Sequence, residues 1–219
     1  MAISNETRTR VKAVFEPIAM AFGRLGLTPD ALTLVGFAIT AGGAALLAAK
    51  LWLVGGLVVF VGGVFDMLDG TLARATGRVS RLGAFMDSVF DRWGEALVYV
   101  GIVIGTSAAG YDPGAWLAAA AMASAFLVSY ARAKSEGLGF SAGTGMAAVG
   151  LMPREIRLVV LSAGLVLAGA LGGVAPGSTG ATVLGAALAI IAVLATVTVI
   201  QRVLHVRAQA REATPGPTA

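Results

Sequence analysis

Residues 65–92 read FDMLDGTLARATGRVSRLGAFMDSVFDR and hold four aspartates and four arginines. The stretch lies in a chain of 219 residues that is 57% hydrophobic and only 13% charged, with a mean hydropathy of +0.85. Soluble domains do not have this composition. The sequence therefore predicts an all-α integral membrane protein in which this stretch joins the ends of two spans.

Apolar runs of the length that a helix needs to cross a bilayer, about 20 residues, extend on both sides of the stretch. Six transmembrane helices are predicted, at residues 31–49, 51–74, 83–107, 114–134, 155–174 and 180–204. Many glycines lie within them, and we expect these to allow close helix packing rather than to carry chemistry. Examples are Gly42, Gly43, Gly62, Gly63, Gly164 and Gly169.

The basic residues alternate between the connections. Lys50 is the only Lys or Arg between the first two spans, and the third and fifth connections have none. Cytoplasmic connections carry the excess of Lys and Arg. The pattern predicts a multi-pass protein of the cell (inner) membrane, with both termini and the charged stretch on the cytoplasmic side.

The N-terminal segment has its own apolar pattern. Its apolar residues recur at helical spacing, at Val11, Val14, Phe15, Ile18, Phe22 and Leu25. With basic residues around them, they predict an amphipathic helix in the membrane interface, although a helix packed on the bundle would give the same pattern. We expect the chain to divide into this cytoplasmic or interfacial segment (1–30), a six-helix transmembrane domain (31–206) and a disordered cytoplasmic tail (207–219).

Composition excludes several kinds of site. The chain has no Cys and one His, His205, so disulfides, cysteine nucleophiles and His-rich metal sites are ruled out. The net charge of +4 does not indicate nucleic-acid binding, because the basic residues are not gathered on one face among aromatics.

The four aspartates form two pairs. Asp66 and Asp69 are three residues apart, and Asp87 and Asp91 are four apart, so each pair projects from one helical face. Carboxylates so close together repel one another unless cations compensate them. Oxygen-only ligands favour Mg²⁺, Mn²⁺ or Ca²⁺. Local ion pairs are the alternative, and the arginines available for them are Arg74, Arg78, Arg81 and Arg92.

Two glycines and an arginine extend the pattern. Gly70 follows Asp69, and Gly83 precedes Asp87 by one turn, so a bulky group could approach the backbone beside each carboxylate pair. Arg74 supplies a planar fork suited to phosphate. Carboxylates, a divalent cation, glycine clearance and arginine together predict a diphosphate site.

The stretch resembles the signature of the CDP-alcohol phosphotransferase family, D-x-x-D-G-x-x-A-R, eight residues, then G-x-x-x-D-x-x-x-D. Every position is filled, by Asp66, Asp69, Gly70, Ala73, Arg74, Gly83, Asp87 and Asp91. The resemblance implies an interfacial helix followed by six spans, a homodimer, and two divalent ions, Mg²⁺ or Mn²⁺. It also implies transfer of a phosphatidyl group from CDP-diacylglycerol to an alcohol, with release of CMP.

The resemblance also implies residue roles. Asp66, Asp69 and Asp87 would bind metal, and Asp91 would be both a ligand and the catalytic base. The residues implied to contact CDP-diacylglycerol are Pro29, Asp30, Ala31, Leu32, Gly70, Arg74 and Ser80. Residues 29–32 could instead be a simple helix start, with Asp30 as its cap.

A second cluster of basic residues is predicted to bind the acceptor. Its predicted phosphate contacts are Ser129, Arg132, Lys134, Arg154, Arg157 and Arg202. An ordinary positive-inside belt is the alternative. The cluster resembles that of bacterial phosphatidylinositol phosphate synthases, which implies inositol 1-phosphate as the acceptor. Glycerol 3-phosphate or another alcohol is the rival.

A cation transporter is the rival of another class, because it would also place carboxylates within spans. It predicts acidic residues through the depth of the membrane. Here only Glu95 extends the cluster inward, which disfavours transport.

Overall fold

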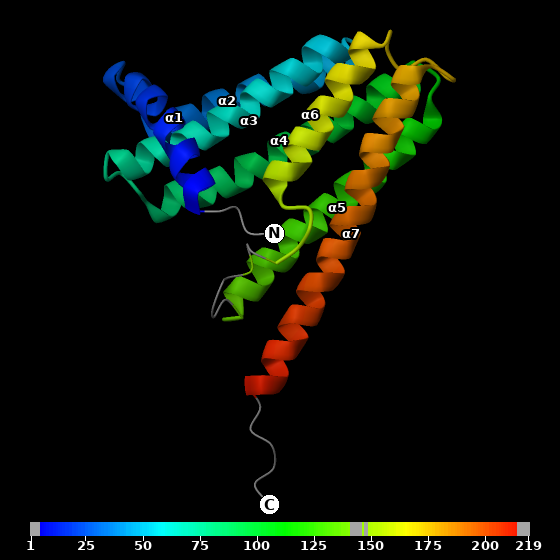
Figure 1. The fold of residues 1–219 in the computed structure, drawn as a ribbon. Coiled ribbons are helices and arrows are strands. Elements are labelled where there is room, and N and C mark those ends of the chain that lie inside the picture. Colours follow the sequence, from blue (N-terminus) through cyan, green and yellow to red (C-terminus); the bar gives the residue numbers. More distant parts are fainter. Residues whose placement is uncertain (1–4, 141–145, 147–148, 214–219) are drawn as a thin grey trace, which may run out of the picture.

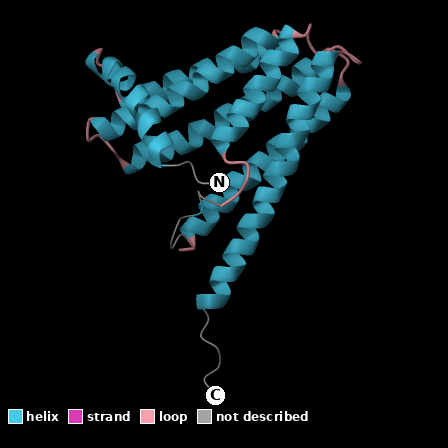
Figure 2. Ribbon diagram, viewed as in Figure 1, coloured by secondary structure: helices cyan, strands magenta, loops and turns pink. Residues whose placement is uncertain are grey.

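The structure is a computed structural model that describes residues 5–140, 146 and 149–213. These residues form helices joined by short connections and contain no strand (Figures 1 and 2). The helices are α1 (Asn5–Arg24), α2 (Pro29–Ala48), α3 (Trp52–Ala75), α4 (Arg81–Ala108), α5 (Asp112–Gly137), α6 (Arg154–Ala170) and α7 (Thr179–Ala213).

Helices α2 to α7 occupy the positions of the six predicted spans. Four of them, α2, α3, α5 and α7, are long and apolar enough to cross a membrane, as expected of a multi-pass membrane protein. Helix α4 concentrates its charged residues in its first half, and α6 has only 17 residues, about 26 Å at 1.5 Å per residue. The connections α2–α3, α4–α5 and α6–α7 gather at one end of the bundle (Figure 1).

The C-terminal helix is longer than predicted. Helix α7 continues to Ala213, so the prediction of disorder from residue 207 is wrong for residues 207–213. The sequence between Gly185 and Ala213 contains neither Gly nor Pro and is rich in good helix formers, which favour continuation beyond the apolar run. Residues 214–219 lie outside the described part of the chain.

Side chains fix where two of the helices begin. Thr28 caps α2, because its Oγ1 accepts a hydrogen bond from the Ala31 N–H at 3.2 Å. The prediction of Asp30 as the cap is therefore wrong, and Asp30 lies in the first turn. Ser80 caps α4 in the same way, by accepting from the Gly83 N–H at 2.9 Å. Both caps lie beside the aspartate motif.

Helices α3 and α6 pack antiparallel through glycines. A Cβ on Gly56 would lie 2.8 Å from Leu165 Cβ, and Gly63 faces Leu158 two turns further along. The packing therefore brings the start of α6 beside Asp66. Of the six glycines expected at helix contacts, five are confirmed, and Gly42 is not, because nothing lies within 4 Å of its hypothetical Cβ.

Helix α1 packs on α3. Phe15, Ala19 and Phe22 contribute to a small apolar cluster with Leu68 and Leu72 of α3. The exposed side chains of Ile18 and Leu25 extend this apolar surface outward, while Val11 and Val14 lie outside the described side chains. The helix is thus docked on the bundle with an apolar edge uncovered.

Candidate active site

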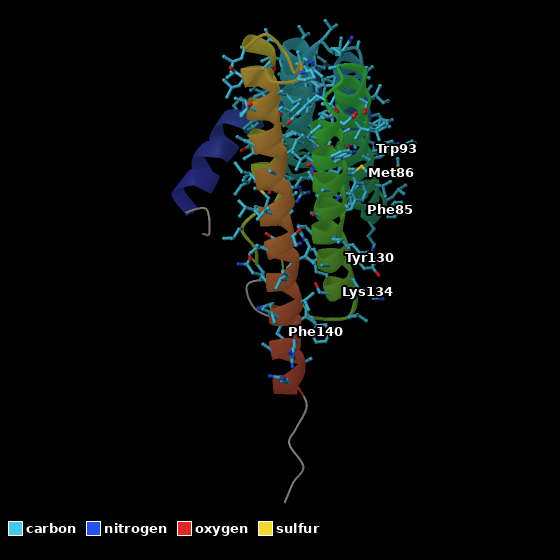
Figure 3. The ribbon with its side chains drawn as sticks, turned by 90° about the vertical axis from the view of Figure 1, so that its right-hand side faces the viewer. Phe85, Met86, Trp93, Tyr130, Lys134 and Phe140 are labelled. Atoms are coloured by element: carbon cyan, nitrogen blue, oxygen red, sulfur yellow. The ribbon has the colours of Figure 1, made fainter. Side chains whose placement is uncertain are left out.

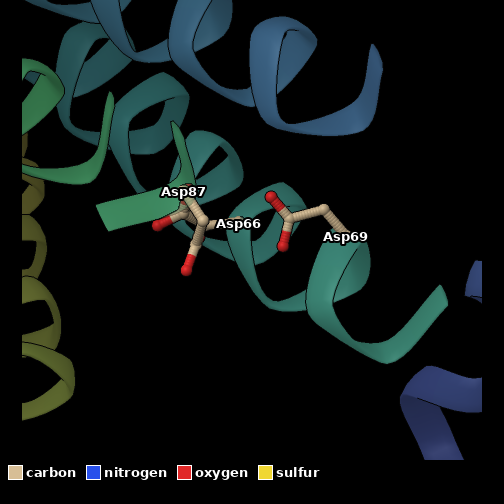
Figure 4. Close-up of side chains that lie close together, drawn as sticks. All are labelled: Asp66, Asp69 and Asp87. Atoms are coloured by element: carbon tan, nitrogen blue, oxygen red, sulfur yellow. The ribbon is translucent and has the colours of Figure 1, made fainter. Parts of the chain in front are cut away.

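Three of the four motif aspartates converge. Asp66 and Asp69 on α3 and Asp87 on α4 each offer a carboxylate oxygen, and these oxygens lie within 4.8 Å of one another (Figure 4). The spacing of the motif places the first two on one face of α3, and the packing of the helices supplies the third.

The carboxylate of Asp69 is the most buried of the three, with 3% of the residue exposed. It accepts hydrogen bonds from the Thr33 hydroxyl and the Gly70 N–H. These donors fix its orientation and offset part of the cost of removing a carboxylate from water. Thr33 lies on α2, so the site draws on three helices.

The cluster fits a hard divalent cation. It consists of three carboxylates, and carboxylate oxygens are the ligand type that Mg²⁺ and Mn²⁺ prefer. The motif contains neither His nor Cys. Repulsion among closely spaced carboxylates would be relieved by a cation among them. Asp66, Asp69 and Asp87 are therefore the residues that would hold the metal.

Asp91 lies beside this cluster in a different environment. Its Oδ2 forms ion pairs with Arg92 Nη1 and Arg154 Nη1, both at 2.9 Å. Its Oδ1 is buried and accepts no hydrogen bond from any described residue. The second terminal nitrogen of Arg154 pairs with Asp66. The guanidinium of Arg154 thus bridges two motif carboxylates.

The alternative of four local ion pairs is not supported. Of the four arginines within or beside the motif, Arg92 is the one that pairs with an aspartate among the described residues. The other compensating cation, Arg154, comes from α6.

One cavity, of about 240 Å³, lies between the starts of α2 and α4 and the end of α3. Five of the predicted CDP-diacylglycerol contacts line it, namely Pro29, Asp30, Gly70, Arg74 and Ser80. A Cβ on Gly70 would lie 3.3 Å from Arg74 Nη1, so the glycine leaves space beside this guanidinium. Ala31 does not line the cavity, and Leu32 is fully buried in the apolar cluster under α1.

A second cavity, of about 550 Å³, opens on the other side of α4, and five arginines line it. Five of the six predicted acceptor contacts are among its lining residues, namely Ser129, Arg132, Arg154, Arg157 and Arg202. Lys134 is not, although Tyr130, one turn before it on α5 and labelled near it in Figure 3, does line the cavity.

Two of these arginines also hold the protein together. Arg157 is 1% exposed and binds both oxygens of Glu95, at 2.8 and 2.9 Å, and the Met152 carbonyl. Arg202 donates to the carbonyls of Val128 and Val149. Because Glu95 is neutralised by Arg157, the inward carboxylate does not extend a path for cations.

Three residues important to this geometry were absent from the predicted site. Thr33 orients Asp69, Arg92 pairs with Asp91, and Glu95 binds Arg157. Arg92 could have been found, because it adjoins Asp91 in sequence. Thr33 and Glu95 act through contacts between helices, for which one sequence holds no signal.

Comparisons with known proteins identify the family of the chain. The family model for CDP-alcohol phosphatidyltransferase matches residues 26–210. Phosphatidylinositol phosphate synthase of Streptomyces avermitilis is 37% identical over 204 residues, which cover 91% of this chain and 80% of the relative. Archaetidylinositol phosphate synthase of Pyrococcus horikoshii is 31% identical over 157 residues, 72% of this chain and 79% of that protein.

Solved structures of Mycobacterium tuberculosis phosphatidylinositol phosphate synthase are also similar. The structure with CDP-DAG bound has a TM-score of 0.75 and 28% identity, and the match covers 89% of this chain and 94% of that one. The complex with manganese and citrate has a TM-score of 0.73 and 27% identity, and covers 88% of each chain. Because the family model matches most of this chain, residues 26–210, the chain belongs to the CDP-alcohol phosphatidyltransferase family.

Proposed function

We propose that this protein transfers the phosphatidyl group of CDP-diacylglycerol to a hydroxyl of inositol 1-phosphate and releases CMP. One observation carries the proposal: Asp87 lines both cavities. The carboxylate cluster therefore lies at the boundary between two compartments, as a reaction between two bound substrates requires. Relatives named for phosphatidylinositol phosphate synthesis support the choice of substrates.

The smaller cavity would take the cytidine diphosphate part of the donor. Arg74 would contact phosphate beside the open space at Gly70, and Asp30 and Ser80 would meet the nucleotide from the starts of α2 and α4. Arginine binds phosphate through two parallel hydrogen bonds. Ala31 and Leu32 would support this wall from behind rather than touch the substrate.

The larger cavity would take the phosphorylated alcohol. An acceptor phosphate beside four aspartates needs cationic partners, and Arg132 and Arg154 face the cavity with part of their side chains exposed. Arg157 and Arg202, whose guanidinium groups bind other parts of the protein, would hold the wall in place. Lys134 stays a predicted contact only if the acceptor reaches the outer edge of α5.

In the reaction, Asp91 would take the proton of the acceptor hydroxyl. The hydroxyl oxygen would attack the lipid-linked phosphorus, and the bond from that phosphorus to the oxygen of CMP would break. Asp66, Asp69 and Asp87, with Asp91, would hold two Mg²⁺ or Mn²⁺ ions. When bound, these ions neutralise charge on the diphosphate and on the departing CMP.

The same proposal places the protein in the cell membrane with six spans, α2 to α7, and α1 at the interface. The excess of Lys and Arg in alternate connections supports a cytoplasmic position for both termini and the site. A homodimer is proposed on the family resemblance. Light scattering of the protein in detergent would measure its mass, and a monomer at all concentrations would contradict the dimer.

The acceptor is tested directly. Purified protein is given CDP-diacylglycerol and Mg²⁺ with inositol 1-phosphate, glycerol 3-phosphate, serine or inositol, and CMP release is measured. We expect release with inositol 1-phosphate and little with inositol, because only the former has the phosphate that the arginines bind. Release with glycerol 3-phosphate alone would replace the proposed acceptor while keeping the reaction.

A further inference from the structure

We propose that Arg154 couples the two halves of the site, so that divalent cation and acceptor phosphate bind cooperatively. The guanidinium is shared: it compensates motif carboxylates when the cluster lacks a cation, and it turns to the acceptor phosphate when the cation is bound. The inference rests on the metal and acceptor sites of the proposed function, and it adds a link between them.

The position of Arg154 supports this role. One terminal nitrogen contacts Asp91 at 2.9 Å and the other contacts Asp66. Asp66 also belongs to the carboxylate cluster. The guanidinium therefore neutralises a carboxylate that a cation would need as a ligand. The two positive groups compete for Asp66.

Arg154 also faces the place to which it would turn. Its side chain lines the larger cavity and is 31% exposed. Among the described residues, its ion-pair partners are Asp66 and Asp91, the carboxylates that a cation would compensate. Nothing in these contacts holds the guanidinium in place once the carboxylates are neutralised.

Arg157, one turn further along α6, provides the contrast. It is 1% exposed, and its three donor nitrogens bind Glu95 and the Met152 carbonyl. Neither partner belongs to the aspartate motif. Arg157 is thus fixed by the fold, whereas the ion pairs of Arg154 within the described part of the chain are with carboxylates that a bound cation would compensate.

Reciprocal coupling follows. A phosphate in the larger cavity attracts Arg154 and removes a competitor from Asp66, so the cation binds more tightly. A cation on the cluster releases Arg154, so phosphate binds more tightly, by the same factor. The exchange also frees the Asp91 carboxylate from Arg154 when both ligands are present, which is when the reaction needs a base.

The test measures Mn²⁺ affinity by calorimetry on chelator-stripped protein in detergent, without turnover. Sulfate, a tetrahedral dianion, represents the acceptor phosphate, and sodium chloride at equal ionic strength is the reference. We expect sulfate to tighten Mn²⁺ binding by about tenfold. Arg154→Gln should bind Mn²⁺ about tenfold more tightly in chloride and should not respond to sulfate. Arg154→Lys, with one donor group, should respond partially.

Arg81→Gln is the control, because it removes an exposed arginine at the start of α4 that lines neither cavity. Its Mn²⁺ affinity in chloride should equal that of the unmodified protein. An unmodified protein indifferent to sulfate would overturn the coupling, and this arm needs no variant to fold. Equal tightening by Arg81→Gln and Arg154→Gln would overturn it as well, by showing a general charge effect. If the unmodified protein binds no Mn²⁺ in either salt, the proposed function fails with it.

Discussion

Asp87 and Asp91 lie one turn apart on α4 and have different surroundings. Asp87 belongs to the carboxylate cluster and lines both cavities. Asp91 lines only the acceptor cavity, and its Oδ2 is paired with two arginines. The first position suits a ligand between two substrates, and the second suits a group that exchanges a proton with the acceptor.

Asp91→Asn separates these roles. The amide keeps the shape of the carboxylate but cannot take a proton, so CMP release should fall by about 10²–10⁴-fold. Mn²⁺ binding at the cluster of Asp66, Asp69 and Asp87 should persist, because these three aspartates converge without Asp91. A radiochemical assay of CMP release and calorimetry with Mn²⁺ measure the two effects on the same preparation.

Asp112→Asn is the control for this change, because Asp112 lies in the first turn of α5, outside both cavities. It should leave both measurements unchanged. Full activity of Asp91→Asn would remove the base assignment. Loss of Mn²⁺ binding together with activity would make Asp91 an essential ligand and leave its role as base unsupported.

At the scale of single residues, the spacing of the motif predicted part of the site from the sequence, whereas the ion pairs could not be predicted. Spacings of three and four residues predicted which carboxylates share a helical face, and the structure adds Asp87 to the pair on α3. The bridge from Arg154 to Asp66 joins residues 88 positions apart. It depends on the register of α6 against α3, which no local pattern encodes.

The register of α6 against α3 is set by the way the two helices pack. Gly56 and Gly63 on α3 receive Leu165 and Leu158 of α6, and one turn further Asp66 meets Arg154. Glycine at such contacts lets two helix backbones approach closely. The packing of two apolar surfaces in the bundle therefore sets the position of a charged group in the site.

Gly56→Ala tests this link. The new methyl group would lie 2.8 Å from Leu165 Cβ and 3.0 Å from the Val166 nitrogen. These atoms belong to the α6 backbone or are fixed to it, so α6 must shift. We expect a loss of about 1–3 kcal/mol of stability and reduced CMP release, measured by thermal unfolding in detergent and by the acceptor assay.

Gly42→Ala is the matched change on α2, where nothing lies within 4 Å of the new methyl group. It should be neutral or stabilising by up to about 1 kcal/mol, since alanine favours helix more than glycine does. Equal destabilisation by both changes would contradict the prediction that the contact of Gly56 with α6 requires glycine.

The ion pair between α4 and α6 is a second contact of this kind. Glu95→Ala leaves Arg157, 2% exposed at its side chain, without its carboxylate, and an unpaired buried charge costs about 3–5 kcal/mol. The exposed pair Arg132–Glu136 provides the comparison: Glu136→Ala should cost at most about 1 kcal/mol. A similar fall in unfolding temperature for both variants would contradict the structural role of Glu95.

Helix positions were largely predictable from hydropathy, and their ends were less so. Each predicted span falls on a helix because an apolar run of bilayer length must form a helix to satisfy its backbone. Helix α7 extends nine residues beyond the predicted 204 because its continuation is polar but helix-forming. Hydropathy reports burial in lipid and does not report where a helix in water stops.

For the molecule as a whole, the proposed topology depends on α4 and α6 crossing the membrane. Helix α6 has only 17 residues, and α4, with 28 residues, is long enough but more charged than the four apolar helices. Yet α4 carries Asp87 and Asp91, and α6 carries Arg154. If both cross, the aspartate motif and the acceptor arginines lie at the same membrane surface, as the reaction requires. If either helix does not cross, the predicted alternation of the connections between the two sides of the membrane is wrong.

Single cysteines resolve this, because the chain has none of its own. Val79→Cys and Ser107→Cys lie at opposite ends of α4, and Leu138→Cys and Ala175→Cys lie before and after α6, all at exposed positions. A membrane-impermeant maleimide should label positions 107 and 175 in intact cells and positions 79 and 138 only in inverted vesicles. Labelling of 79 and 107 from one side would show that α4 does not cross, and the same result for 138 and 175 would show it for α6. CMP release by each variant confirms that the labelled protein is folded.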